Sequence, residues 1–567
     1  MSLGYTRYNV GMYMRTTKRT NKDGSVVKYL QLAHNERDPK TGCPVAKVIY
    51  NFGREELVDK DALKRLMQSI ARVLSTDEHV AAQMGFDVGS VTINSDKALG
   101  GVWALEQLWE KLGIRATLAR LLVDRQFAAP MEKAIFAMVA NRALAPASKL
   151  AIEDWVENDV VIPGLPEVQV HQLYRAMDFL IANGDEVQES VFFSTANLLN
   201  LEVDLLYFDT TSTYFEVEPD PDDEEELRRL GHSKDHRPDL LQAVIGLAVT
   251  REGIPVRCWI WPGNTSDMDV IAGVKKDLSG WKLGRVITVV DRGFSSAENL
   301  RHLQRAGGHY IAGERMRAGM DSVEQALSRQ GRYKAVRDNV EIKEIVIGHG
   351  EARSRYVLVR NPLEAERDRG RRERTLELLQ EELKKLKPCK GEQHSKAVCE
   401  LMASRRYGKY LKLGSDGVPR VDQTRVKQDA RLDGKYLIRT SDDTLSPEDI
   451  ALGYKQLLEV EDAFRSLKST LDLRPIYHRL ADRIRAHILI CWLALLLVRV
   501  AETRVRDTWP RIRTQLDRIR IVEIESSDGR VAQRTELTPA QKGILTALGI
   551  EEPKRIHEIV FKTKPGA

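Results

Sequence analysis

The chain of 567 residues has little cysteine and no long apolar run. Its five cysteines are odd in number and widely spaced, without a CxxC pair, which argues against a disulfide framework and for a reducing compartment. The longest apolar run, Ile488–Val498, is shorter than the roughly 20 residues that span a bilayer, and the N-terminus carries no apolar signal core. We therefore predict a cytoplasmic protein without a membrane partner, in which Ile488–Val498 forms a buried helix.

The sequence also lacks a strong excess of either charge. Charged residues make up 30% and apolar residues 42%, a balance typical of folded globular proteins, and the formal net charge is only +5. Residues 1–60 hold eleven Lys and Arg against six Asp and Glu. The local charge of this segment is therefore a better indication of a phosphate-containing partner than the net charge of the whole chain. At this length, three or four structural units are expected.

The first 200 residues divide into two patterns. Residues 1–60 alternate basic and apolar positions around a turn at Lys22–Gly24, which predicts a small β-rich unit. Its basic residues fit either DNA phosphates or a solvated strand face. Residues 61–200 show the three- and four-residue apolar spacing of helices, at 105–114, 131–144 and 173–184. These helices fit either a DNA-binding region or a packing domain.

From residue 201 the pattern changes to alternating strands and helices. Strands are expected at 203–209, 241–250, 255–261 and 286–290, with helices at 268–278 and 295–304. Shorter strands follow at 308–313, 342–348, 355–360 and 435–440. The highly charged segment 366–387 is predicted to be an exposed helical arm, because its leucines repeat at helical spacing. One long helix is expected from Pro447 to Leu471.

Two aspartates are the first candidates for chemistry. Asp209 ends the apolar stretch LLYFD, and Asp291 ends ITVVD. Carboxylates at the ends of buried strands meet at the open edge of a sheet, where two of them can share a divalent cation such as Mg²⁺. Each aspartate alone also fits a turn or a helix cap.

A third carboxylate lies on the helix predicted after Pro447. Tyr454, Glu461 and Lys468 are seven residues apart, and this spacing places them on one stripe of a continuous α-helix. From that stripe Glu461 can reach the strand ends, and Lys468 can neutralise a phosphate. Ordinary amphipathicity is the alternative explanation for this spacing.

These segments together resemble bacterial insertion-sequence transposases of the DDE type. Tyr454-x2-Leu457-x3-Glu461-x6-Lys468 is similar to their Y-x2-R-x3-E-x6-K signature. The segments YFDTTSTYFE, GHSKDHRPDLLQAVIGL, WPGNTSD, VVDRGFSS and RPIYH, followed by RIRAHILICWLALLL, resemble the other family segments in the same order. The resemblance runs from about residue 200 to 500, with a weaker likeness in the basic N-terminal unit.

The resemblance implies an α/β fold with an RNase H-like core that an insertion domain interrupts. Before the core, we expect a small basic β-rich unit at 1–60 and a helical, DNA-binding region at 61–200. The core would consist of residues 201–314 and 434–505, with the insertion domain at 315–433 between them. A C-terminal region at 506–567 would contribute DNA or dimer contacts. Asp209, Asp291 and Glu461 map to catalytic ligands of two Mg²⁺ ions, for which Mn²⁺ would substitute. Tyr454 and Lys468 map to contacts with the DNA ends.

The implied activity is metal-dependent cleavage at the terminal inverted repeats and strand transfer into target DNA by a nucleoid-associated homodimer. Two features depart from the family pattern. Leu457 stands where the signature has Arg, and Arg465 is the candidate to replace that phosphate contact. The insertion contains no Trp, so Tyr333, Tyr356, Tyr407 and Tyr410 are its available aromatic side chains for stacking on a base. A stand-alone RNase H-like nuclease and a transposase-derived DNA-binding regulator are the alternatives, with a phosphatase that uses an Asp nucleophile a distant third.

Overall fold

The computed structural model describes residues 12–21, 26–37, 44–66, 92–123, 128–201, 203–216, 227–281, 283, 285–317, 319–348, 353–386, 391–526 and 529–561. The chain divides into two compact units. The first comprises Met1–Thr92, Glu525–Val531 and Arg555–Ala567, and the second comprises Ile93–Ile524 and Ala532–Lys554.

The first unit contains a three-stranded antiparallel sheet. Its strands are β1 (Met12–Thr20), β2 (Val26–Arg37) and β3 (Pro44–Arg54), with β2 in the centre. Two register shifts interrupt the pairing of β2 with β3. These three strands lie within residues 1–60, for which the sequence predicts strands, while the predicted turn at Lys22–Gly24 lies outside the described residues. The strand β18 (Ile556–Phe561) belongs to this unit as well.

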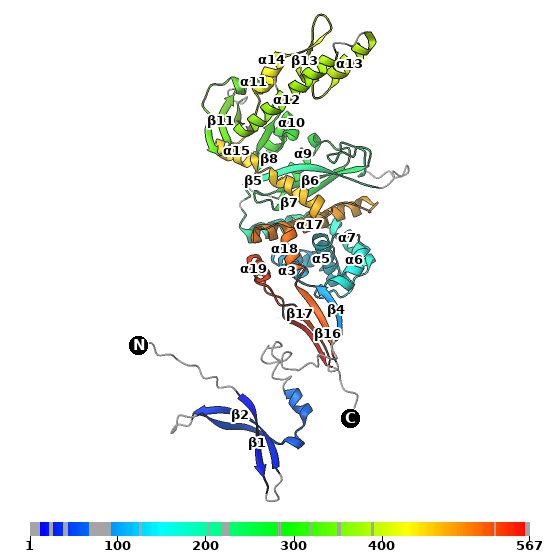
Figure 1. Cartoon of the computed structure of the whole chain (residues 1–567), viewed down its shortest axis with the longest axis vertical. Helices are drawn as coiled ribbons and strands as arrows, with labels where there is room; N and C mark the ends of the chain where they lie inside the picture. The colour runs from blue at the N-terminus through cyan, green and yellow to red at the C-terminus, as the bar shows by residue number, and fades with distance from the viewer. Residues whose placement is uncertain are drawn as a thin grey trace, which may run out of the picture. The chain divides into compact units, whose positions relative to one another are not determined.

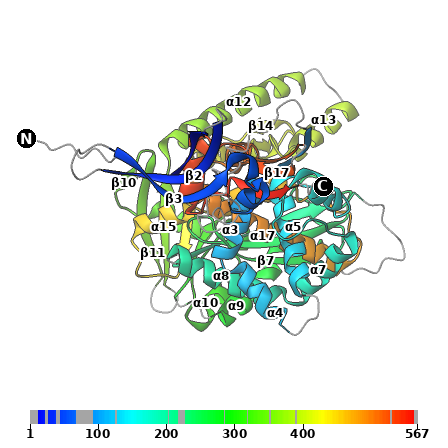
Figure 2. The ribbon, with the colours of Figure 1, turned by 90° about the horizontal axis from the view of Figure 1, so that it is seen from below.

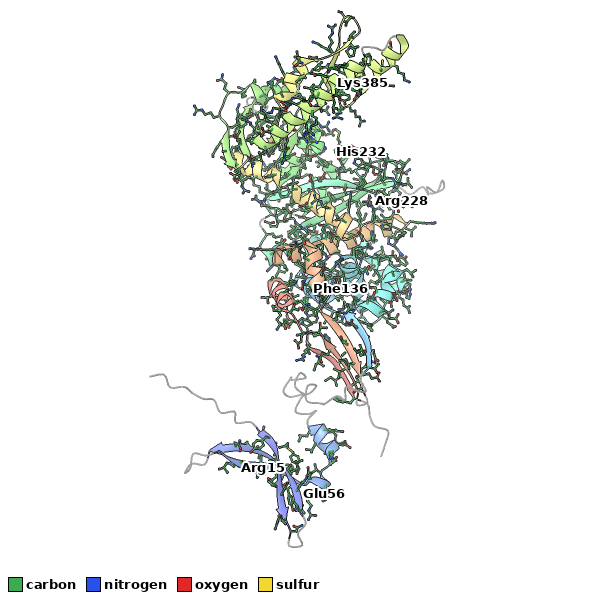
Figure 3. All side chains as sticks on the ribbon, viewed as in Figure 1. Arg15, Glu56, Phe136, Arg228, His232 and Lys385 are labelled. Carbon is green, nitrogen blue, oxygen red and sulfur yellow. The ribbon has the colours of Figure 1, made fainter. Side chains whose placement is uncertain are left out.

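After a first strand, β4 (Thr92–Ala98), the second unit continues with helices, as expected. They are α3 (Gly100–Lys111), α4 (Ile114–Leu121), α5 (Ala128–Leu144), α6 (Ala151–Asp154), α7 (Val170–Ala182) and α8 (Gly184–Leu199). Most apolar residues of α5 and α7 are buried, and Phe136 of α5, labelled in Figure 3, is 0% exposed. The apolar faces of these helices therefore build a core layer, and a DNA contact by this region stays a prediction.

A nine-stranded mixed sheet forms the centre of the second unit (Figure 1). Its strands are β5 (Leu205–Tyr214), β6 (Gln242–Val249), β7 (Pro255–Pro262), β8 (Ile287–Val290), β9 (His309–Glu314), β10 (Lys334–Arg337), β11 (Val340–Ile347), β12 (Ser354–Arg360) and β15 (Lys435–Thr440). The order is β10-β11-β12-β15-β9-β8-β5-β6-β7. Parallel pairing in this sheet involves β8, with β5 on one side and β9 on the other. Every residue of β6 is buried, which explains its continuous apolar run.

The region expected to be a separate insertion contributes strands to this same sheet. β10, β11 and β12 extend it beyond β15, because β12 pairs with β15 from Arg355 to Arg360. The helical arm is confirmed as α12 (Pro362–Leu386), a 25-residue helix. The same region also holds α13 (Gly391–Ala403), α14 (Gln423–Ala430) and the short strands β13 (Leu411–Leu413) and β14 (Pro419–Val421). In the view of Figure 2, α12 and α13 lie on the opposite side from α9 (Asp267–Gly280) and α10 (Ala297–Gln304), which follow β7 and β8, while α11 (Asp321–Ser328) follows β9.

The apolar run near the C-terminus forms the buried helix that the sequence predicts. It is α17 (Ala481–Val505), which lies between the central sheet and the helical layer (Figure 1). Among the described residues it is the one helix long and apolar enough to cross a membrane, but 89% of its most apolar window is buried inside the protein. The helices α18 (Trp509–Leu516) and α19 (Pro539–Leu548) contact α17, and the strands β16 (Arg520–Glu525) and β17 (Gly529–Arg534) are also described.

Candidate active site

The central sheet brings the two predicted aspartates side by side. In the parallel pairing of β5 with β8, Phe208 lies opposite Val290, so the next residue on each strand is one of the aspartates. β8 ends at Val290, as predicted. β5 does not end at Asp209 but continues to Tyr214, because β6 pairs with it along the whole of this stretch. Asp209 therefore lies in the middle of its strand, at the point where its neighbour β8 stops.

Burial and neighbouring charges set the protonation of Asp209. Its side chain is 24% exposed, and the backbone N–H of Thr210 donates to its Oδ1 at 2.7 Å. Burial raises the pKa of Asp209 to about 6, and the carboxylates of Asp267 and Asp291 add to that rise. The ammonium of Lys234, 3.9 Å from Asp209 Oδ1, and the Thr210 N–H act in the opposite direction. Because of this raised pKa, the Asp209 carboxyl keeps its proton to a higher pH than an exposed aspartate does.

Asp267 is a third carboxylate at this place that the sequence argument did not select. It is the first residue of α9, after the N-cap Ser266. It accepts a hydrogen bond from the Thr210 hydroxyl, and its Oδ2 lies 3.4 Å from Lys234 Nζ. The segments WPGNTSD and GHSKDH, which contain Asp267 and Lys234, were signals in the sequence, but only the fold shows that both meet Asp209.

The helix predicted to carry Tyr454, Glu461 and Lys468 is not continuous. It is divided into α15 (Pro447–Lys455), α16 (Leu458–Arg465) and the π-helical turn η8 (Ser466–Thr470). At the break, Leu457 N donates to Tyr454 O in a tighter turn, and the Gln456 side chain accepts from the Tyr207 hydroxyl at 2.9 Å. The expectation of one straight stripe is therefore wrong, because the backbone tightens at Gln456–Leu457 and widens in the π-helical turn, so the number of residues per turn changes along the segment.

Tyr454 contacts the second aspartate directly. Its hydroxyl donates to Asp291 Oδ1 at 3.1 Å, and its ring packs beside that of Tyr436 with 5.9 Å between centroids. Gly313 of β9 makes room for this side chain, because a Cβ there would lie 2.1 Å from the tyrosine oxygen. Burial, and then the charge of Asp291, raises the pKa of Tyr454, so the hydroxyl keeps its proton and acts as a donor.

Glu461 shares a cavity with Asp291. The cavity holds about 310 Å³, and its lining includes Asp291, Tyr454, Leu457 and Glu461 together with Val340, Val359, Asn361 and Tyr436. Glu461 is exposed on α16. Leu457, which replaces the signature arginine, is 8% exposed and supplies an apolar wall. Within the described part of the chain, no group of three His, Cys, Asp or Glu side chains is placed to hold one metal ion, so the side chains of Asp209, Asp291 and Glu461 do not converge on a single point.

The two predicted phosphate contacts differ in their surroundings. Lys468 Nζ forms an ion pair with Asp235 Oδ1 at 2.8 Å, and its side chain is 19% exposed. Arg465 is 70% exposed and pairs with Asp462 on its own helix at 2.5 Å. Two of the insertion tyrosines serve mainly in packing, since Tyr356 and Tyr410 are 5% and 3% exposed.

A sequence model of the transposase DDE domain matches residues 212–497, half of the chain. The chain belongs to the insertion-sequence DDE transposases. A model of the N-terminal domain of IS1634 family transposases matches residues 14–80. No curated protein matches this transposase. Among solved structures, it is similar to a piggyBac transposase synaptic complex with hairpin DNA, with 9% identity over 74% of this chain and 79% of that chain, and a TM-score of 0.35.

Membership of the family establishes the activity in general terms. The transposase acts on DNA and depends on a divalent metal ion. The DDE match begins just after Asp209 and includes Asp291 and Glu461. The mixed α/β fold agrees with the sequence prediction at the level of fold class.

Proposed function

We propose that this transposase cuts DNA at the terminal inverted repeats of its element and joins the freed ends to target DNA, with Asp209, Asp291 and Glu461 as the catalytic carboxylates. The observation that carries the proposal is the pairing of β5 with β8, which places Asp209 beside Asp291, together with the cavity that Asp291 shares with Glu461. Three antiparallel strands, β5 to β7, followed by the parallel strands β8 and β9, support an RNase H-like core.

The donor set of this site fits hard divalent cations. Carboxylate oxygens are the ligands that Mg²⁺ prefers, and Mn²⁺ accepts the same ligands. Asp209 and Asp291 would hold the ions, and Glu461 would complete the set from the cavity wall. Two Mg²⁺ ions bound there supply activation of the attacking oxygen and stabilisation of the leaving oxygen.

The protein's own side chains have separate tasks in this reaction. Tyr454 holds the Asp291 carboxylate in one orientation through its hydroxyl. Lys468 and Arg465 contact phosphates beside the cut, and Lys468 lies on the turn that follows Glu461. In the first step a water oxygen bonds to phosphorus and the bond to the 3′ oxygen breaks, which leaves a 3′ hydroxyl. That hydroxyl then attacks a target phosphodiester in the same way, and no covalent enzyme intermediate is needed. Because two ends must be held together, we propose a homodimer on DNA.

One face of the N-terminal sheet supports recognition of the repeat. Directly opposed residues of antiparallel strands share a face, and the register places Arg15 opposite Gln31, Gln31 opposite Asn51, and Arg54 opposite Tyr29. Arginine, glutamine and asparagine are the side chains that read base edges in DNA. Among the paired residues that the structure describes on this face there is no Asp or Glu. We propose that this face enters a groove of double-stranded DNA at the terminal repeat.

The test is cleavage of a labelled duplex that carries the element's own terminal repeat, with Mg²⁺ or with EDTA. Glu461→Gln is compared with Glu298→Gln on α10, whose side chain is 77% exposed and pairs with His302 one turn along. We expect nicking at the repeat boundary with Mg²⁺, lost by more than about a hundredfold in Glu461→Gln and kept in Glu298→Gln. Both variants should bind the duplex as wild type does. Binding without cutting by the wild type would instead identify a regulator, and cutting without strand-transfer products would identify a nuclease.

A further inference from the structure

The loop 231–236, in which Figure 3 labels His232, contributes opposite charges to the two halves of the candidate site. Lys234 Nζ donates to Thr210 O and to Thr210 Oγ1, both at 2.7 Å, and lies within 4 Å of Asp209 and Asp267 carboxylate oxygens. The next residue, Asp235, lies between two cations. Its Oδ1 is 2.8 Å from Lys468 Nζ, and its Oδ2 is 3.3 Å from Arg474 Nη1.

The loop is held in this position by the protein's own framework. Lys234 N donates to Ser212 Oγ on β5 at 2.8 Å, and Ser233 Oγ accepts from Asp235 N and Arg237 N. Gly231 packs so closely that a Cβ there would lie 1.9 Å from the backbone oxygen of Gly263. Asp235 is only 17% exposed. The two charged contacts are therefore part of the folded structure, unlike most surface ion pairs.

Each contact occupies groups that would bind a metal ion or a DNA phosphate at the proposed site. The Lys234 ammonium lies among two carboxylates and two further oxygens, beside the proposed metal ligand Asp209. A carboxylate between a lysine and an arginine has the charge and the acceptor oxygens of a phosphate group. Adjacent residues of one loop thus meet the carboxylates and the phosphate-binding cations at the same time.

We propose that Asp235 is a positioning residue that occupies Lys468 and Arg474 until a DNA phosphate replaces it. This inference rests on the proposed function, because it takes Lys468 as a DNA contact. When a phosphate displaces the Asp235 carboxylate, Lys468 and Arg474 become free to contact the DNA, while the backbone of the loop stays held at Ser212.

The test is the affinity of the full chain for the terminal-repeat duplex in EDTA, measured over a range of salt concentrations. Asp235→Asn keeps the shape of the side chain and removes its charge. We expect roughly tenfold tighter binding at low salt, because two cations become free for phosphate. The slope of log affinity against log salt should steepen by about 0.9 for each additional phosphate that the variant neutralises.

Three further variants make the result specific. Asp239→Asn removes the same charge from a neighbouring exposed residue and frees Arg237 instead of Lys468 and Arg474, so it measures what loss of a carboxylate beside an exposed cation does to binding. Asp235→Glu keeps the charge and should bind the duplex no more tightly than wild type. Asp235→Asn combined with Lys468→Gln should lose the tighter binding that Asp235→Asn shows alone.

Weaker binding of the duplex by Asp235→Asn would overturn the inference, because Asp235 would then hold Lys468 in place for DNA. An unchanged salt slope would also overturn it, because no additional phosphate would be neutralised. An equal increase in affinity in Asp239→Asn would also overturn it. Failure of the proposed function looks different, since the wild type would then neither bind nor cut the repeat. Wild-type cutting without tighter binding by Asp235→Asn would reject only the role of Asp235.

Discussion

Asp209→Asn should stabilise the metal-free transposase at neutral pH while it abolishes cleavage. Burial raises the pKa of the Asp209 carboxyl from 3.8 to about 6, so ionisation of this group is less favourable in the folded protein than in the unfolded chain. Each pKa unit corresponds to about 1.4 kcal/mol of difference between folded and unfolded states. The ionised carboxylate therefore costs the folded protein about 3 kcal/mol at neutral pH, and an asparagine avoids this cost.

The direction of the pH dependence follows from the raised pKa. Between about pH 4 and pH 6 the folded state keeps a proton that the unfolded state has released, so this group's contribution to stability is lost as pH rises through that window. Asparagine does not titrate. The free energy of unfolding of Asp209→Asn should exceed that of the wild type by about 0.6 kcal/mol near pH 4 and by about 3 kcal/mol near pH 7 and above. A further difference that does not depend on pH adds to both values.

Urea unfolding in EDTA at a series of pH values, followed by circular dichroism, measures this difference. Asp239→Asn is the matched control, because the hydrogen bond from Arg237 lowers the pKa of Asp239 and the control should lose stability relative to wild type as pH rises. A difference between Asp209→Asn and wild type that does not change with pH would refute the reasoning. Adding Mg²⁺ should stabilise the wild type more than Asp209→Asn.

Three other sets of substitutions test the surroundings of the site and the N-terminal sheet. Tyr454→Phe removes the hydroxyl that donates to Asp291 and keeps the ring, so single-turnover cleavage at saturating DNA should fall by about ten- to a hundredfold, and an unchanged rate would show that Asp291 does not need this bond. Gly313→Ala places a methyl group on the tyrosine oxygen and should slow cleavage at least as much, whereas Gly273→Ala, with nothing within 4 Å of the added Cβ, should not. Arg15→Ala and Arg54→Ala should each weaken binding to the repeat and flatten the salt slope by about 0.9 for each phosphate that is no longer neutralised, and equal binding at every salt concentration would exclude the N-terminal sheet from DNA recognition.

Local pattern was enough to locate most elements of the core. The apolar stretches before Asp209 and Asp291 form β5 and β8, and the uninterrupted run Ile488–Val498 lies within α17. These predictions succeed because a strand or helix that is buried on all sides needs a continuous run of apolar residues, whatever it packs against. The seven-residue spacing also identified Tyr454 and Glu461, which line one cavity, although through a broken helix.

What the sequence by itself determined is therefore the identity of the elements, their order and the residue types that suit DNA cleavage. Only the tertiary structure decided which strands are neighbours: it placed β8 beside β5 and joined β10, β11 and β12 to the central sheet. It also brought Lys234, Asp235 and Asp267 to the site. These side chains come from a loop and the start of a helix, and their contacts are distant in sequence. Periodicity in the sequence does not indicate which charged side chains lie together in the folded chain.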